Sequence, residues 1–167
     1  HNIETQRGIG SSTNGAGAFG GSINIQTLKR NAVAYAQLSN SYGSFNTQRH
    51  SVGMGTGMLN KYFTLDARLS YIASDGYIDR ASSNLKSYFL AGNYYGNRHS
   101  LRLLASGGHE ITYQAWEGVP AEIIDTNRTY NPYTYDNQVD DYRQNHYQLH
   151  YGYQLASRLT LKLGLHY

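Results

Sequence analysis

Aromatic and cationic side chains concentrate in one long, mainly polar stretch, residues 108–143. The members that could contact a ligand are His109, Tyr113, Trp116, Arg128, Tyr130, Tyr133 and Tyr135. Aromatic rings stack on flat ligands, and a guanidinium pairs with anionic ligands such as an iron chelate. Tyr and Trp also hold loops together by packing. The stretch is therefore a candidate ligand-binding loop, with a packed loop as the alternative interpretation.

The same stretch ends in four side chains that carry oxygen atoms: Asp136, Asn137, Asp140 and Asp141. Hard cations such as calcium take such ligands, but the spacing is not that of an EF-hand, and solvated carboxylates are the simpler interpretation. Three of the seven histidines, His146, His150 and His166, fall on the polar side of alternating segments. A metal or haem role would need two of them to converge, which spacing cannot show. We expect no metal site and no cofactor.

Catalytic chemistry is not indicated. The chain has no Ser/His/Asp set with a supporting motif and no paired carboxylates on a recognisable scaffold, so we expect no enzyme. Its net charge of +3 comes from 14 Lys+Arg against 11 Asp+Glu, without a cationic block. Scattered charge of this kind does not follow a phosphate backbone, and we expect no nucleic-acid partner.

Alternating apolar and polar residues predict the elements that carry these side chains. In 159–167 the odd positions are Leu or Tyr and the even positions are Thr, Lys, Gly or His. The same alternation runs through 62–73 and 145–155. Strands place successive side chains on opposite faces, so residues 31–167 are predicted to form antiparallel strands of about ten residues. The fold class is all-β.

The connections between these strands differ in length. Short turns are predicted at 59–61, 95–99 and 156–158, and long connections at 74–84 and 108–143; the short turn at 43–46 is the exception. Short turns at one rim and long loops at the other are typical of outer-membrane barrels. Tyrosines stand near the strand ends, as in interfacial aromatic girdles, although Tyr also favours strands in general: Tyr35, Tyr42, Tyr62, Tyr71, Tyr94, Tyr95, Tyr153 and Tyr167.

Composition narrows the class further. The 167 residues include 17 Tyr, 18 Gly, no Cys and only 15% charged residues, against about a quarter charged in soluble domains. Disulfides and thiolate metal sites are excluded. Mean hydropathy is negative, and no run approaches the roughly 18 apolar residues of a membrane helix. Membrane strands remain open, because their apolar residues alternate. Alternation alone does not distinguish them from a soluble sandwich, which buries its apolar face.

Residues 4–27 carry a more specific pattern. An Arg7-Gly8 pair precedes a small-residue stretch, and Gly20-Gly21 then leads into Ser22-Ile23-Asn24-Ile25-Gln26-Thr27. This order resembles the closing segment of the plug domain in TonB-dependent outer-membrane receptors, with Arg7, Gly8, Gly20, Gly21 and Asn24 as the plug motif. Ser22 replaces a common hydrophobic residue, and 13–16 replaces an aromatic-Gly pair. These departures resemble receptors of the Bacteroidetes. No GxxxxGK[ST] is present, so a phosphate-binding loop is not indicated.

The resemblance implies a fragment of a large antiparallel transmembrane β-barrel, about 22 strands when complete, with the end of an internal plug domain. Residues 1–30 would close the plug, and 31–167 would form about the first seven strands of the wall. The implied function is TonB-dependent active import of a scarce nutrient (an iron chelate, haem, cobalamin or a glycan) across the bacterial outer membrane. Implied partners are outer-membrane lipid, the small-molecule nutrient and the inner-membrane TonB energy-coupling complex, reached through a segment before His1. A surface lipoprotein is a further candidate partner.

Two other classes remain open. One is a passive or structural outer-membrane β-barrel without energy coupling, and the other is a soluble or secreted β-rich binding module. About seven strands cannot close a membrane barrel, and an open edge in lipid leaves backbone groups unsatisfied. We therefore expect the chain not to fold as an autonomous domain.

Overall fold

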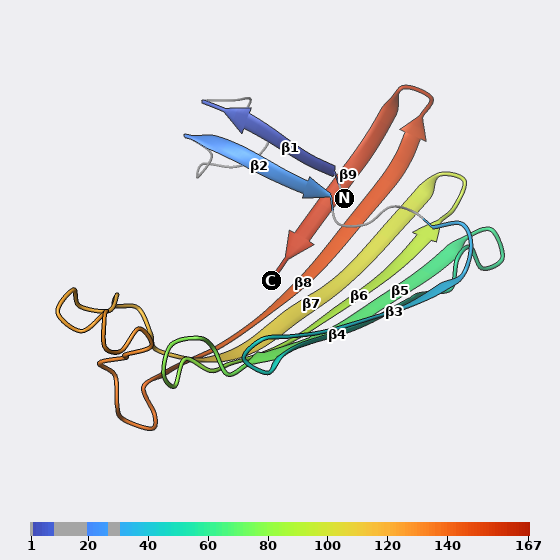
Figure 1. The fold of residues 1–167 in the computed structure, drawn as a ribbon. Coiled ribbons are helices and arrows are strands. Elements are labelled where there is room, and N and C mark those ends of the chain that lie inside the picture. Colours follow the sequence, from blue (N-terminus) through green and yellow to red (C-terminus); the bar gives the residue numbers. More distant parts are fainter. Residues whose placement is uncertain (1, 9–19, 27–30) are drawn as a thin grey trace. The chain divides into compact units, whose positions relative to one another are not determined.

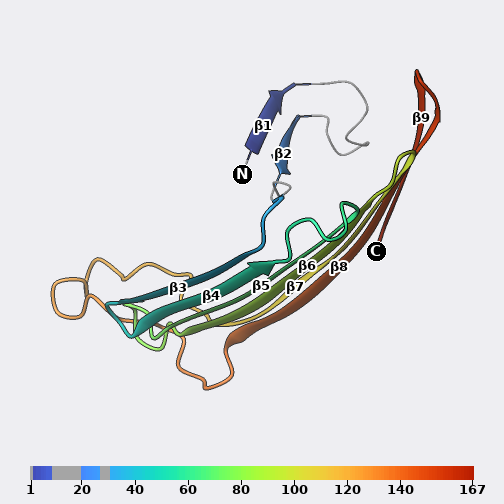
Figure 2. The same cartoon turned by 90° about the vertical axis from the view of Figure 1, so that its right-hand side faces the viewer.

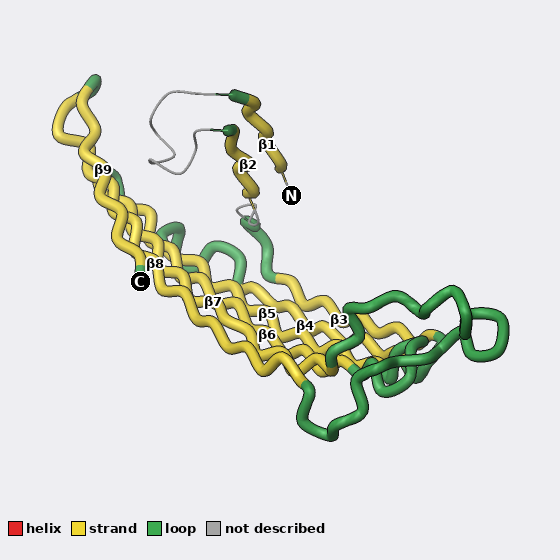
Figure 3. The backbone as a smooth tube through the Cα atoms, turned by 90° about the vertical axis from the view of Figure 1, so that its left-hand side faces the viewer, coloured by secondary structure: helices red, strands yellow, loops and turns green. Residues whose placement is uncertain are grey.

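The computed structural model describes residues 2–8, 20–26 and 31–167. Contacts divide the chain into two units, His1–Asn31 and Ala32–Tyr167. The described residues form β-strands joined by turns and loops, as Figure 3 shows. None of them belongs to a helix long and apolar enough to cross a membrane. The predicted all-β class with antiparallel pairing is confirmed.

The first unit is an antiparallel hairpin of β1 (Asn2–Arg7) and β2 (Gly21–Gln26). Arg7 pairs with Gly21, and the Gly8 backbone N–H donates to the carbonyl oxygen of Gly20 at 3.2 Å. Gly21 has φ +150°, and a Cβ there would lie 2.8 Å from the carbonyl oxygen of Gln6. The Arg7-Gly8 pair and the Gly20-Gly21 pair of the sequence motif therefore meet at one end of the hairpin. The small-residue stretch 9–19 and Thr27 lie outside the described residues.

The second unit is a seven-stranded antiparallel sheet in which each strand pairs with its neighbour in sequence (Figure 1). The strands are β3 (Tyr35–Gly43), β4 (Thr47–Gly55), β5 (Phe63–Ser74), β6 (Ser83–Tyr95), β7 (His99–Tyr113), β8 (Val139–Ala156) and β9 (Leu159–His166). The outer edges of β3 and β9 pair with no other described strand. The sheet curves along its strands, as Figure 2 shows.

The two longest connections, 75–82 and 114–138, lie at the same end of the sheet, which they share with the short turn 44–46 (Figure 1). At the short-turn end lie 56–62, 96–98 and 157–158; at the long-loop end lie 44–46, 75–82 and 114–138. Asn60 and Lys61 adopt positive φ values of 48° and 66° and close the β4–β5 turn. The predicted short turns are confirmed. These turns lie at one end because consecutive strands run in opposite directions, so every second connection falls at the same end of the sheet.

The predicted extent of the longest loop, 108–143, is wrong at both of its ends. Backbone pairing of β7 with β8 continues to the Tyr113–Val139 pair, so the loop spans only 114–138. His109 and Tyr113 are therefore strand residues of β7, and Asp140 and Asp141 are strand residues of β8. These polar residues stay in strands because the backbone pairing of β7 with β8 continues through them.

The sheet has no hydrophobic core of ordinary size. Among the described residues only two hydrophobic side chains are buried, Ala91 and Tyr113. Leu161, Leu163 and Leu165 are 54%, 49% and 56% exposed. A soluble sheet normally buries its apolar face; this one leaves it open.

Candidate functional site

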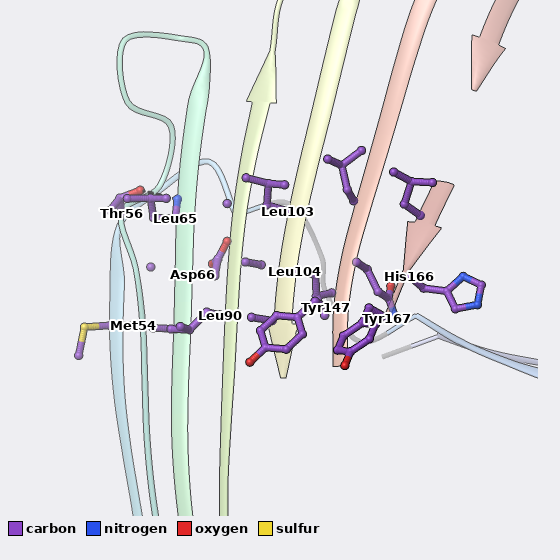
Figure 4. Close-up of a pocket in the computed structure, with 18 residues that line it drawn as sticks. Met54, Thr56, Leu65, Asp66, Leu90, Leu103, Leu104, Tyr147, His166 and Tyr167 are labelled. Atoms are coloured by element: carbon purple, nitrogen blue, oxygen red, sulfur yellow. Dashed lines mark hydrogen bonds between the residues drawn. The ribbon is translucent and has the colours of Figure 1, made fainter. Parts of the chain in front are cut away.

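The apolar face of the sheet is continuous across its strands. Register places Leu65 of β5, Leu90 of β6 and Leu103 of β7 on this face, where all three side chains are exposed. Figure 4 shows Leu65 and Leu103 at one level of the sheet, with Leu90 on the strand between them and two residues further along. Together with Tyr147 and Tyr167 they line an open hollow of about 970 Å³. The hollow can hold apolar groups, because the residues around it are mainly aliphatic and aromatic.

Aromatic side chains border the apolar face at the short-turn end. The rings of Phe63 and Tyr94 lie 5.1 Å apart, centroid to centroid, and those of Tyr62 and Tyr94 lie 6.3 Å apart. Two strands further on, a His99 ring nitrogen is 2.7 Å from the Tyr151 hydroxyl. This border combines apolar rings with polar tips, the combination that suits a boundary between apolar and aqueous surroundings.

A second aromatic border lies on the same face toward the long-loop end. It consists of Tyr71, Tyr88, Tyr147 and Tyr167, one from each of β5, β6 and β8 and one from the end of β9. The rings of Tyr147 and Tyr167 stack with centroids 6.4 Å apart. Tyr35 and Tyr95, which the sequence placed in the same set of strand-end tyrosines, instead lie on the polar face by register.

The polar face is linked from strand to strand by side-chain hydrogen bonds. Asn93 Nδ2 donates to Thr64 Oγ1 at 3.0 Å, and Arg102 Nε donates to Asn93 Oδ1 at 2.9 Å. Thr64 is 3% and Asn93 7% exposed. The Tyr35 hydroxyl donates to Asp66 Oδ1 at 3.1 Å. The most buried positions of the sheet therefore include polar groups that satisfy one another.

The same face carries a polar groove of about 610 Å³ nearer the long-loop end. Its lining includes Arg49, Arg68, Glu110 and His146. Charges of both signs share the groove, so its lining does not select an ion of one sign. Of the three histidines expected on the polar side, His150 makes a 3.2 Å contact from Nε2 to Gln148 Oε1.

The structure does not assemble the candidate calcium ligands. Asp140 and Asp141 are consecutive residues of β8 and therefore point to opposite faces. Asp141 Oδ1 instead lies 2.6 Å from Nε2 of His109, and Asp136 is in the loop. Within the described ranges, no group of three His, Asp or Glu side chains is arranged to hold a metal ion.

The seven candidate ligand residues do not converge. Tyr113 is 7% exposed, and its hydroxyl donates to the Tyr135 carbonyl oxygen at 2.7 Å, so it packs the base of the loop. The Tyr133 hydroxyl donates to Glu117 Oε1 at 3.4 Å; partial burial and the Glu117 carboxylate raise the pKa of Tyr133. Only the rings of Trp116 and Tyr135 are widely exposed, at 68% and 76%.

The other three members of that set lie apart. His109 belongs to β7 and faces the apolar side of the sheet, where it contacts Asp141. Arg128 is exposed and Tyr130 is half-buried, both within 114–138. The loop thus combines a packed base with exposed aromatic rings, and the two interpretations of the sequence each apply to part of it.

Sequence reasoning missed the residue that organises the long-loop end, Asn131. This side chain is 2% exposed, and its Nδ2 donates to the carbonyl oxygens of Asp79 at 2.8 Å and Gln114 at 3.0 Å. Its Oδ1 accepts from the Tyr133 backbone N–H at 3.0 Å. The only signal in the sequence is the Asn131-Pro132 step, which favours a turn.

Arg80 was missed as well. From loop 75–82 its guanidinium donates to the carbonyl oxygens of Asn131 at 2.7 Å and Tyr133 at 2.9 Å. Asp79 N–H also donates to the Thr129 carbonyl oxygen at 2.7 Å. The two long loops are therefore fastened to one another by backbone-directed bonds.

No protein-family model matches the chain, and no curated protein matches it either. The two faces of the sheet and the motif of residues 4–27 are the features of the chain that bear on its function.

Proposed function

We propose that the seven-stranded sheet is part of the wall of a transmembrane β-barrel in a bacterial outer membrane. The observation that carries the proposal is the inverted burial of the two faces. Polar Thr64 and Asn93 are almost inaccessible, whereas Leu65 and Leu69 on the opposite face are 56% and 57% exposed. In water, burial of this apolar surface would stabilise the sheet by about 25 cal/mol per Å². Contact with acyl chains accounts for the exposure.

The dimensions of the apolar face support this proposal. Phe63 and Tyr71, in the two aromatic borders, stand eight residues apart on one face of β5. At about 3.4 Å per residue they lie roughly 27 Å apart along the strand. A strand tilt of about 40° reduces this to about 20 Å across a membrane, near the roughly 25 Å apolar band of outer-membrane barrels. Long loops at one end and short turns at the other fit the same class.

Closure of such a wall needs further strands. The outer edges of β3 and β9 have no described partner, and unpaired backbone groups are costly in lipid. In the proposed barrel, additional strands pair with both edges.

Site-directed spin labelling provides the test, because residues 1–167 contribute no cysteine of their own. Single cysteines replace Leu161, Lys162, Leu163 and Gly164 in turn, and the full-length protein is reconstituted in lipid vesicles. We expect labels at 161 and 163 to collide with oxygen and those at 162 and 164 with a water-soluble nickel chelate. Equal accessibility of all four labels to the nickel chelate would overturn the membrane wall.

We further propose that the protein imports a scarce nutrient by a TonB-dependent mechanism, with unit 1 as the end of the plug. Support comes from the motif of residues 4–27 and from the hairpin in which Gly8 N–H bonds the Gly20 carbonyl oxygen. Glycine at these positions permits the positive φ of +79° at Gly8 and the close approach of β1 at Gly21. The nutrient class stays open among iron chelates, haem, cobalamin and glycans.

A conductance experiment separates this proposal from a passive barrel. We expect the full-length protein to be closed to ions in planar bilayers and to support uptake only in cells with an intact energy-coupling complex. Deletion of residues 2–26 should open a pore. A wild-type protein that conducts ions freely would favour the passive or structural barrel.

A further inference from the structure

A line of polar and cationic residues crosses the apolar side of the sheet near its long-loop end and includes Tyr71 of the second aromatic border. Register pairs His50 with Tyr71, Tyr71 with Lys86, Lys86 with His109 and His109 with Arg143. These five residues therefore form one row across β4–β8, perpendicular to the strands, on the same face as the leucines. We call Lys86 and Arg143, with His109 between them, the cationic row.

The two permanent cations of the row have no side-chain partner in the described part of the chain. The side chains of Lys86 and Arg143 are exposed, and neither makes an ion pair or a side-chain hydrogen bond with a described residue. The nearby carboxylate, Asp141, lies against His109 at 2.6 Å. Exposed cations usually find solvent or a mobile counter-ion. Here the two cations lie beside an apolar surface. An anion held at the same level along the strands would contact both of them.

Along strands β6–β8, the cationic row is followed by the tyrosine border and then by the apolar hollow. Lys86 is two residues beyond Tyr88 on one face of β6, and Arg143 is four residues beyond Tyr147 on β8. At about 3.4 Å per residue these offsets are about 7 and 14 Å. Lys86 and Arg143 are two strands apart, about 10 Å at the usual strand spacing. The order along the strands is therefore leucine hollow, tyrosine border and cations.

We infer that the cationic row binds the phosphate-bearing headgroup of a membrane lipid whose acyl chains lie in the hollow lined by Leu90, Leu103 and Tyr147. The inference rests on the proposed membrane wall and adds a lipid site to it. Lysine and arginine form charge-assisted hydrogen bonds with phosphate oxygens, and Arg does so in bidentate geometry. The tyrosine hydroxyls lie at the depth of the headgroup–chain junction. Acyl chains and phosphate in one molecule match both parts of this surface.

The test uses the full-length protein in mild detergent, with native mass spectrometry to count the lipids retained. The probe is phosphatidic acid; phosphatidylcholine with the same acyl chains is the neutral control. We expect wild type to retain phosphatidic acid over phosphatidylcholine on the order of tenfold, from two cations near the headgroup plane. The double variant Lys86→Gln/Arg143→Gln should reduce this preference to less than twofold.

A matched control variant, Arg68→Gln/Lys162→Gln, removes two cations from the polar face and should keep the preference. An unchanged preference in Lys86→Gln/Arg143→Gln, or equal loss in the control variant, would overturn the inference. Competition by millimolar inorganic phosphate as efficient as that by the lipid would also overturn it, since the acyl chains would then contribute nothing. If the protein passes the spin-label test but shows no headgroup preference, the lipid site alone is wrong. If it fails the spin-label test, both proposals are wrong.

Discussion

The hydroxyl of Tyr88 donates to Oδ1 of Asn145 at 3.0 Å, although the two residues belong to strands that are not neighbours. Gly107 of the intervening β7 lies directly between them by register. A Cβ at Gly107 would stand 2.8 Å from Tyr88 Cε1 and would also collide with Asn145 Oδ1. The tyrosine thus crosses a whole strand because the residue beneath it has no side chain.

The same arrangement occurs on the opposite face at the other end of the sheet. The Tyr35 hydroxyl of β3 bonds Asp66 of β5 across Gly55 of β4. A Cβ at Gly55 would lie 2.7 Å from Asp66 Oδ1. Each of these ties joins three strands by one side chain, in a sheet that has little core to hold it together.

Replacement of Gly107 by alanine should destabilise the sheet by about 1–3 kcal/mol, because the methyl group overlaps Tyr88 and the Gln144 backbone. The measurement is the free energy of unfolding from urea titration of the refolded full-length protein. Gly164→Ala is the matched control, since its Cβ would meet His150 Nδ1 at an ordinary 3.6 Å. We expect the control to be neutral; equal loss in both variants would contradict the strand-crossing role of Gly107.

Replacement of Asn131 by alanine should loosen both long loops together. The change leaves the carbonyl oxygens of Asp79 and Gln114 without their amide donor, at about 1–3 kcal/mol for each buried group left unpaired. Hydrogen exchange should accelerate in 75–82 as well as in 114–138. Asn127→Ala, which removes only local bonds to Thr129, is the control. Faster exchange confined to 114–138 would show that the loops are not coupled through Asn131.

Tyr133 should ionise at higher pH than an ordinary tyrosine. Partial burial and the Glu117 carboxylate both disfavour the phenolate, so its pKa lies above the ordinary 10.0. Because its pKa is raised in the folded state, Tyr133 stabilises the fold at pH values below the pKa of the unfolded phenol. This contribution is lost as the pH rises through the folded pKa. Difference absorbance between wild type and Tyr133→Phe isolates this titration. Glu117→Gln should lower the midpoint; an unchanged midpoint would remove Glu117 as a cause.

Trp116 should report ligand binding at the long-loop end. It is the only tryptophan of the chain and is 68% exposed. We expect acrylamide to quench its emission readily in the free protein, and a nutrient ligand that stacks on the loop to protect it. The fluorescence of Trp116→Phe gives the background. Unchanged quenching across iron chelates, haem, cobalamin and glycans would remove Trp116 from the candidate site.

The strands were largely predictable from the sequence, because a period of two over 62–73, 145–155 and 159–167 leaves few other structures. The ends of β7 and β8 were not. In β8 the residues just before Tyr147 are polar on both faces apart from Tyr142, and in β7 the stretch 107–110 interrupts the apolar face, so the alternation that marks a strand weakens while backbone pairing continues. β1 was missed for the same reason, since Asn2–Arg7 contains one apolar residue.

Side-chain convergence was the least predictable part of the site. The aromatic residues of the long loop were identified by type, but spacing could not separate buried Tyr113 from exposed Trp116. Asparagine is rarely found fully buried, and nothing in the sequence marks Asn131 as the exception. Arg80 was equally hidden, because its acceptors are backbone carbonyls more than fifty positions later in the chain.

The fastening of one long loop to the other by Arg80 has a mechanical consequence. Loop 75–82 closes the β5–β6 hairpin and loop 114–138 closes the β7–β8 hairpin, so a force on either loop is shared by four adjacent strands. A molecule that binds Trp116 or Tyr135 would contact two loops that are coupled to one another. Movement of these loops would be transmitted to β5 through the Arg80 guanidinium as well as through the sheet. Neither loop can move alone unless the Arg80 bonds break together with those that join Asp79 to Thr129 and Asn131.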